Sequence, residues 1–235
     1  MSTKKKSEEK TVEELLLESG VVKFSPEYPF RYKKGLISPF YCDTKSLFDF
    51  SMIYPGFVKP FQDKIYEIWQ QTKPLSLRLA AVDGATCWAA LCAWNMVETH
   101  TDMYRGFDAV KHLPFCWVLQ EARNSSLYGQ IEGAKLRDSQ GNDVIIIENV
   151  IKTGGSTLDA IRKIRLAGGN PIGVVAILSY DLPSVKQALE EEKVPIVTLT
   201  TVDKILTTAL EKGYLSEDQA QVIDAWHQDP ENWGK

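Results

Sequence analysis

The sequence predicts an α/β fold, organised as one domain around a central parallel sheet that helices flank. Three observations lead to this fold class. Short apolar segments of strand length alternate with segments of helical apolar spacing along most of the 235 residues. The segment 144–147 (VIII) is continuously β-branched, which is typical of a strand buried on both faces. Strands that helices separate in the sequence pair in parallel through right-handed crossovers.

The N-terminal quarter is expected to contain a short helix followed by irregular strands. Residues 1–10 are mostly polar or charged and offer almost nothing to bury, so we expect a disordered lead. Thr11 and Glu14 match a capping box, which opens a helix that Gly20 ends. The segment 21–54 is rich in aromatic residues and interrupted by prolines, which indicates short strands or irregular structure.

Helices and strands alternate over the rest of the chain. We expect helices over 60–71, 84–99, 156–167, 183–193, 201–212 and 216–228. We expect strands over 75–82, 114–119, 144–148, 172–178 and 195–199. Ser216 and Gln219 match a second capping box, at the start of the last helix. The polar, glycine-containing segment 123–141 is long enough to be a mobile loop.

Composition and charge exclude several classes of protein. The net charge is −4, without the basic surplus of a nucleic-acid binder. No apolar stretch approaches the roughly 20 residues of a membrane span, and no signal-peptide pattern is present. The four cysteines form no CxxC pair and the three histidines have no metal-ligand spacing. We therefore expect reduced thiols, no protein metal site and a cytoplasmic location.

A phosphate site is expected where the buried strand 144–148 leads into the helix that begins at Ser156. The connection contains two glycines and three hydroxyl residues in a row of five: Thr153, Gly154, Gly155, Ser156 and Thr157. Glycines let backbone N–H groups face an anion, and a helix N-terminus favours negative charge. Glu148 is placed to accept hydrogen bonds from the hydroxyls of a sugar bound beside the phosphate. The pattern is not GxxxxGK[ST], GxGxxG or GxSxG, and the alternative interpretation is an ordinary strand-to-helix turn.

This segment resembles the phosphoribosyl-pyrophosphate (PRPP) loop of type I phosphoribosyltransferases, in which two acids precede a Thr/Gly-rich turn. The segments 22–24, 32–41, 195–206 and 228–233 resemble those of orotate phosphoribosyltransferases, and the likeness runs from about Thr11 to Trp233. It implies a type I phosphoribosyltransferase-like fold over 11–235. The small N-terminal hood of that fold would comprise about 11–55 plus C-terminal parts.

The resemblance also implies a reaction and its site. Ribose 5-phosphate would pass from PRPP to a ring nitrogen of a pyrimidine-like base such as orotate, with release of pyrophosphate, in pyrimidine biosynthesis. Mg²⁺ would accompany PRPP, and the chain would form a homodimer that binds neither nucleic acid nor membrane. The implied catalytic residues are Lys33, Arg123, Glu148 and Asn149. The implied PRPP-binding residues are Asp83, Gly84, Ile151, Lys152, Thr153, Gly154, Gly155, Ser156 and Thr157. The implied base-binding residues are Phe40, Tyr41 and Tyr180.

Several positions depart from the family pattern. Asn149 stands where the family has its second acid, and an amide cannot balance the charge of an oxocarbenium-like ribosyl centre. Leu119 and Gln120 replace a basic pair of the catalytic loop, and Tyr180 lies near the position of an arginine that contacts orotate. The alternatives are therefore a PRPP- or nucleotide-binding homologue with little or no activity, or a transferase for a different base. For a weakened transferase, we expect Asn149→Asp with Gln120→Lys to raise the rate.

Overall fold

The computed structural model describes residues 10–32, 37–82, 84–99, 113–121, 130–136, 142–230 and 232–233. The chain divides into two compact units, one formed by Met1–Gly56 with Asp203–Lys235 and the other by Phe57–Val202. The first unit uses the same two stretches of chain as the expected hood. The organisation as a single domain stays a prediction.

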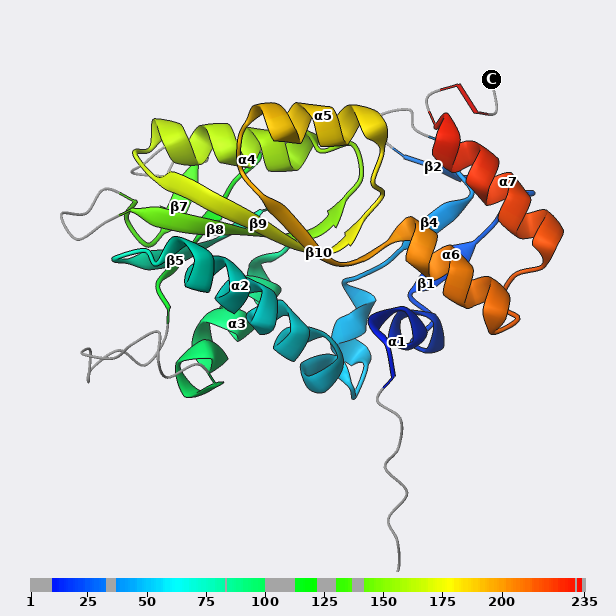
Figure 1. The fold of residues 1–235 in the computed structure, drawn as a ribbon, viewed down its shortest axis with the longest axis horizontal. Coiled ribbons are helices and arrows are strands. Elements are labelled where there is room, and N and C mark those ends of the chain that lie inside the picture. The colour runs from blue at the N-terminus through cyan, green and yellow to red at the C-terminus, as the bar shows by residue number, and fades with distance from the viewer. Residues whose placement is uncertain are drawn as a thin grey trace, which may run out of the picture. The chain divides into compact units, whose positions relative to one another are not determined.

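The larger unit contains a six-stranded sheet among its described residues, and this confirms the α/β fold class (Figure 1). In spatial order the strands are β10 (Ile196–Thr201), β9 (Asn170–Ser179), β8 (Asp143–Ile151), β5 (Leu77–Val82), β6 (Phe115–Val118) and β7 (Ile131–Gly133). All neighbours pair in parallel except β6 and β7, which are antiparallel. The expected central parallel sheet is therefore confirmed, and the short strand β7 adds one antiparallel pairing at its edge.

Strand β7 also corrects the expected loop over 123–141. Its three residues pair with Cys116, Trp117 and Val118. The Trp117 indole N–H donates to Glu132 at 2.9 Å across the pair. Such a short strand has no periodicity of its own, because its pairing depends on backbone hydrogen bonds to a distant segment.

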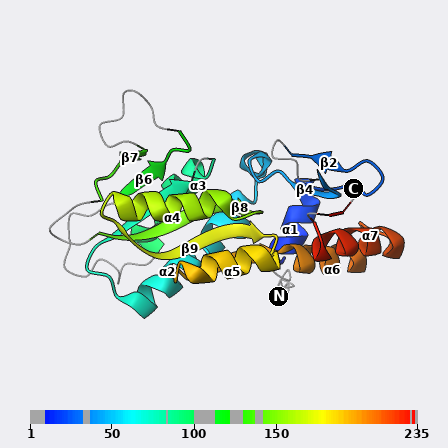
Figure 2. The same ribbon diagram turned by 90° about the horizontal axis from the view of Figure 1, so that it is seen from above.

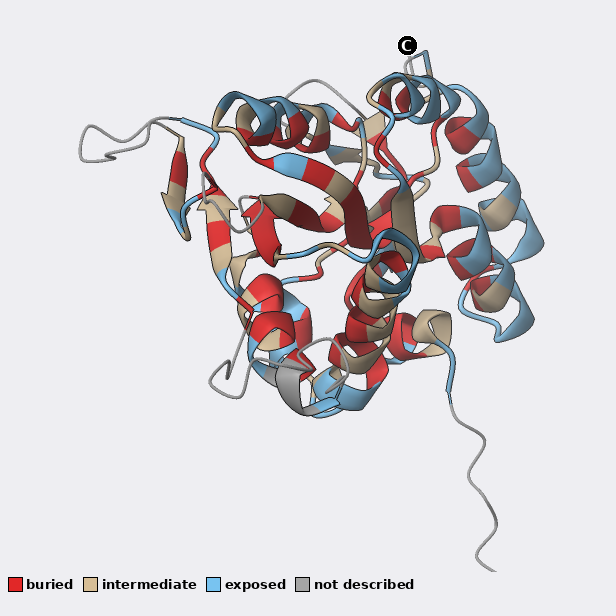
Figure 3. Cartoon of the chain, turned by 60° about the vertical axis from the view of Figure 1, so that its left-hand side comes forward, coloured by how far each residue is buried: buried red, intermediate tan, exposed pale blue. Residues whose placement is uncertain are grey.

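Helices cover both faces of this sheet. Helices α2 (Lys59–Thr72) and α3 (Thr86–Thr99) lie on one face, and α4 (Gly155–Leu166) and α5 (Pro183–Glu191) lie on the other (Figure 2). Between these layers, Ile145, Ile146 and Ile147 are fully buried, as the β-branched run predicts, and the central strands are largely buried throughout (Figure 3). Helix and strand boundaries differ from the expected ones mainly by one or two residues.

The smaller unit contains two short antiparallel strand pairs and three α-helices among its described residues. Strand β1 (Val22–Phe24) pairs with β4 (Phe40–Cys42), and β2 (Phe30–Arg31) pairs with β3 (Ile37–Ser38), both antiparallel. Its helices are α1 (Val12–Glu18), α7 (Glu217–Gln228) and α6 (Val202–Glu211), which starts at the last residue of the larger unit.

Side-chain hydrogen bonds hold the smaller unit together. Both expected capping boxes are confirmed, at the starts of α1 and α7. The Trp226 indole N–H of α7 donates to the Ile37 carbonyl at 2.8 Å. Lys212, directly after α6, pairs with Glu14 of α1 at 2.5 Å, and this contact raises the pKa of Lys212 and lowers that of Glu14. None of the described helices has the length and apolar character that crossing a membrane requires.

Candidate functional site

The candidate site lies at the carboxyl end of β8, where ligands of open parallel sheets bind. The strand does not end at Glu148 as expected, because its pairing with β9 continues through Val150 and Ile151. Glu148 and Asn149 therefore lie within the strand. The ten-residue β9 supplies the additional partners, a length that the local sequence around Glu148 does not reveal.

The two glycines of the turn after β8 differ in their surroundings. Gly154 has a φ of 69° and is the residue that precedes α4, and a Cβ there would lie 2.8 Å from Val185 Cγ1. Gly155 begins α4 and is exposed, and a Cβ there would approach only Thr153 Oγ1, at 4.0 Å. The backbone therefore requires Gly154, whereas a side chain at Gly155 would extend into open space beside the helix start.

Glu148 connects the strand to the start of the helix. Its Oε1 accepts the Asn149 backbone N–H at 3.0 Å, and its Oε2 accepts the Ser156 hydroxyl at 3.1 Å and the Thr157 hydroxyl at 3.5 Å. The residue is only 4% exposed. A carboxylate at the N-terminus of a helix is also favoured by the helix dipole. These contacts give the carboxylate a defined orientation beside the glycine turn.

Asn149 connects the same strand to the turn between β5 and α3. Its side-chain Nδ2 donates to the Gly84 carbonyl at 2.8 Å, across 65 positions of sequence. Gly84 has a φ of 92°, and in the same turn the Ala85 N–H donates to the Val82 carbonyl. The other amide atom, Asn149 Oδ1, is buried and accepts no hydrogen bond from the described residues. The structure thus brings the predicted PRPP-binding residue Gly84 together with the predicted catalytic residue Asn149.

The predicted base-binding residues occupy both units. Tyr180 is fully buried directly after β9, its N–H donates to the Ile151 carbonyl, and Lys152 Nζ lies 6.0 Å from its ring centroid. Phe40 and Tyr41 belong to β4 of the smaller unit, and burial raises the pKa of Tyr41. The remaining predicted residues, Lys33, Asp83 and Arg123, lie outside the described part of the chain.

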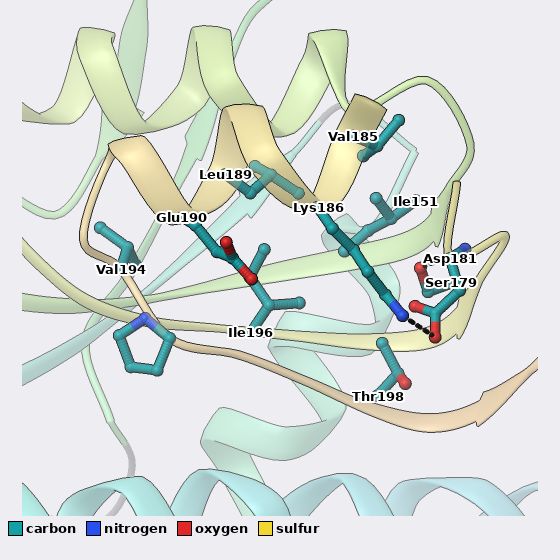
Figure 4. A pocket seen from close by; sticks show the side chains of 11 residues that line it. Ile151, Ser179, Asp181, Val185, Lys186, Leu189, Glu190, Val194, Ile196 and Thr198 are labelled. Atoms are coloured by element: carbon teal, nitrogen blue, oxygen red, sulfur yellow. Dashed lines mark hydrogen bonds and ion pairs between the residues drawn. The ribbon is translucent and has the colours of Figure 1, made fainter. Parts of the chain in front are cut away.

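A cavity of about 280 Å³ lies between α5 and the strands β9 and β10. Figure 4 shows Lys186 reaching from α5 toward Asp181, with which it pairs at 3.1 Å, while Val185 and Leu189 supply apolar lining. Asp181 directly follows Tyr180 and has a positive φ of 54°. Sequence reasoning missed both charged residues. Their pairing results from the turn after β9 and has no recognisable motif.

Lys163 is a second residue that sequence reasoning missed. Its ammonium donates to the Leu119 and Gln120 carbonyls, at 2.8 and 3.1 Å, and pairs with Asp159 at 2.5 Å. The Leu119 N–H donates in turn to the Gln130 carbonyl, and the Gln130 amide donates to the Gln120 carbonyl. Lys163 therefore connects α4 to Leu119 and Gln120, which are themselves bonded to Gln130. The predicted loop residue Arg123 lies between these positions in the sequence.

Comparisons with known proteins give concordant results. Orotate phosphoribosyltransferase of Listeria monocytogenes serotype 4b is 33% identical over 227 residues, covering 97% of this chain and 99% of the relative. The enzyme of the same name from Phocaeicola vulgatus is 34% identical over 231 residues, covering 97% and 98%. No family model matches the chain.

Solved structures show the same fold. Orotate phosphoribosyltransferase from Aeropyrum pernix aligns with a TM-score of 0.62 at 20% identity, over 88% of this chain and all of that chain. The UMP synthase of Leishmania donovani aligns with a TM-score of 0.66 at 21% identity, over 92% of this chain and 41% of that chain.

Proposed function

The chain belongs to the orotate phosphoribosyltransferase family, and from this membership we propose that it transfers ribose 5-phosphate from PRPP to orotate. The new bond joins C1 of the ribose to a ring nitrogen of the base, and the bond from C1 to the pyrophosphate oxygen breaks. The chain is accordingly a glycosyltransferase of the pentosyltransferase class.

The observation that supports this reaction best is the arrangement around Glu148. A buried carboxylate, a glycine in the left-handed region at Gly154 and the N-terminus of α4 at Gly155 lie next to one another in a single connection. The helix start suits the 5-phosphate, and the adjacent carboxylate suits the ribose hydroxyls. A ribose phosphate presents both of these groups.

The hydroxyls of Ser156 and Thr157 connect the two halves of this site. Each hydroxyl has one hydrogen to donate, and in the structure both hydrogens are directed to Glu148 Oε2. A phosphate at the start of α4 would attract these donors, and Glu148 Oε2 would then accept a hydrogen bond from the ribose. Phosphate binding would in this way prepare the carboxylate for the sugar.

Catalysis requires positioning and electrostatics rather than a protein nucleophile. The carboxylate of Glu148 places negative charge beside the ribosyl centre, which becomes cationic as pyrophosphate leaves. The backbone around Gly155 holds the 5-phosphate. The binding energy gained at this phosphate, away from the reacting carbon, orients C1 toward the base.

We propose that the donor substrate is Mg²⁺–PRPP, in which the ion arrives with the diphosphate. Both oxygens of Glu148 already accept hydrogen bonds from the chain. Bound Mg²⁺ would neutralise charge on the departing pyrophosphate.

The homodimer and the cytoplasmic location are further parts of the proposal. Cys42, Cys87, Cys92 and Cys116 are all free thiols, which suits a reducing compartment. Sedimentation equilibrium of the purified chain measures the oligomeric state directly. A monomer at all concentrations up to 50 times those of the activity assay would refute the dimer.

The test of the function is release of pyrophosphate from PRPP with orotate, with and without Mg²⁺. We expect release that depends on both orotate and Mg²⁺, and slower release with uracil, adenine or guanine. Release with another base alone would establish a different acceptor. If the chain bound PRPP but released no pyrophosphate with any base, it would be a PRPP-binding homologue without transferase activity. Membership of the family does not favour this alternative.

A further inference from the structure

The side chain of Asn149 joins two backbone segments that are distant in sequence. Its Nδ2 donates to the Gly84 carbonyl at 2.8 Å, and the residue is 8% exposed. Gly84 lies in the turn that leads from β5 into α3, where the resemblance places binding of the diphosphate. The contact is thus a direct bond between the ribose side and the diphosphate side of the site.

The chemistry of this bond requires a hydrogen-bond donor at position 149. A carbonyl oxygen can only accept a hydrogen bond, and an ionised carboxylate has no hydrogen to donate. An ionised acid at position 149 would therefore place an electron-rich oxygen, in the position of Nδ2, at hydrogen-bond distance from the Gly84 carbonyl. It would also add a second negative charge directly beside Glu148. A neutral donor at this position removes both conflicts.

We propose that Asn149 is a positioning residue, whose amide sets the orientation of the Gly84 peptide and hence of the diphosphate-binding turn. The inference rests on the transferase function proposed above. On this proposal, Asn149 replaces the family's second acid because the turn at Gly84 needs a hydrogen-bond donor there. The replacement is then not a loss of function.

The proposal reverses the effect expected from the sequence for an acid at this position. Asn149→Asp should lower the rate at neutral pH, because the bond to Gly84 is replaced by repulsion. Protonation of the introduced carboxyl supplies a hydrogen that can again be donated to Gly84. The variant should therefore recover relative to wild type as the pH falls through the pKa of that carboxyl, which its surroundings raise.

The chain offers a matched control at the other end of the same strand. The side-chain amide of Asn142, directly before β8, donates to the Gly168 carbonyl. Asn142→Asp removes the same kind of bond and adds the same charge, away from the turn at Gly84. A third variant, Asn149→Ala, removes the donor without introducing a group that titrates.

Other titratable groups are common to all these proteins. Near the carboxyl end of β8, the described titratable groups on β8 and on the elements packed against it are Glu148 on β8 itself, Cys87 on α3 and Asp159 on α4. Wild type and Asn149→Ala contain all three groups. The ratio of kcat/KM between each variant and wild type at each pH therefore shows the titration of the introduced carboxyl alone.

The experiment measures kcat, KM for PRPP and the thermal unfolding midpoint of the four proteins between pH 5 and pH 9. At pH 8 we expect Asn149→Asp and Asn149→Ala to lose at least tenfold in kcat/KM, and Asn142→Asp to stay within twofold of wild type. Toward pH 5 the aspartate variant should regain at least threefold in kcat/KM relative to wild type, and the gap between its unfolding midpoint and that of wild type should narrow. The alanine variant should show neither change.

Two results would overturn the proposal. One is an Asn149→Asp variant as active as wild type at pH 8, or more active. The other is a loss that is the same at every pH and is matched by Asn142→Asp. A wild type that releases no pyrophosphate would refute the proposed function, and PRPP calorimetry with the unfolding midpoints would still decide the role of Asn149.

Discussion

Replacing Gly155 with valine tests whether the start of α4 receives the 5-phosphate. The residue is exposed, has no positive φ, and a Cβ there would have only Thr153 Oγ1 near it, at 4.0 Å. The isolated chain should therefore tolerate the valine, with a stability change within about 0.5 kcal/mol. The branched side chain would instead occupy the space through which an anion approaches the helix N–H groups.

The expected loss of affinity follows from the bonds that the valine would prevent. A hydrogen bond to a charged group contributes about 1.5–3 kcal/mol. Losing one such bond to the phosphate weakens PRPP binding by roughly 10- to 150-fold. Isothermal titration calorimetry with Mg²⁺–PRPP measures this change, and the thermal unfolding midpoint of the same sample verifies the fold.

Gly154→Ala is the matched control for this experiment. It replaces the neighbouring glycine, where the expected effect is a loss of stability. At a φ of 69° an alanine costs about 1–2 kcal/mol, and its Cβ would lie 2.8 Å from Val185 Cγ1. For a chain of this length, that cost lowers the unfolding midpoint by about 2–8 °C. Unchanged PRPP affinity in Gly155→Val, with the fold intact, would refute the placement of the phosphate.

Three further predictions follow from the described contacts. Glu148→Gln keeps the shape but removes the charge, so PRPP affinity should fall at least tenfold by calorimetry, and an equal affinity would contradict the assigned role. Burial raises the pKa of the Cys116 thiol to about 12, so the unreactive thiol form prevails at pH 8. A thiol reagent should then modify the exposed Cys87 first, and equal rates for both cysteines would be inconsistent with this burial. Lys163→Met removes the donor to two backbone carbonyls beyond β6, so kcat should fall about tenfold with KM for PRPP little changed. Lys163→Arg should restore kcat, and the surface variant Lys64→Met should leave kcat unaltered. An unaffected kcat in Lys163→Met would exclude a positioning role for Lys163.

Features that depend on neighbours in the sequence were predictable from it. The capping boxes at Thr11 and Ser216 form as expected, because each involves only groups three residues apart. The buried strand around Ile146 and the helix that begins at Gly155 follow from β-branched composition and glycine placement. The family resemblance of the glycine turn agrees with relatives that cover nearly the whole chain.

Contacts between distant segments required the tertiary structure. The Asn149 amide donates to Gly84 across 65 positions, and Lys163 donates to carbonyls more than 40 positions away. Neither bond has a local pattern, because its geometry depends on how β5, β8 and α4 are aligned in the sheet and its covering layer. From the sequence alone, Asn149 is a missing acid. The structure shows an amide that donates to Gly84, because parallel pairing of β5 and β8 brings their carboxyl ends together.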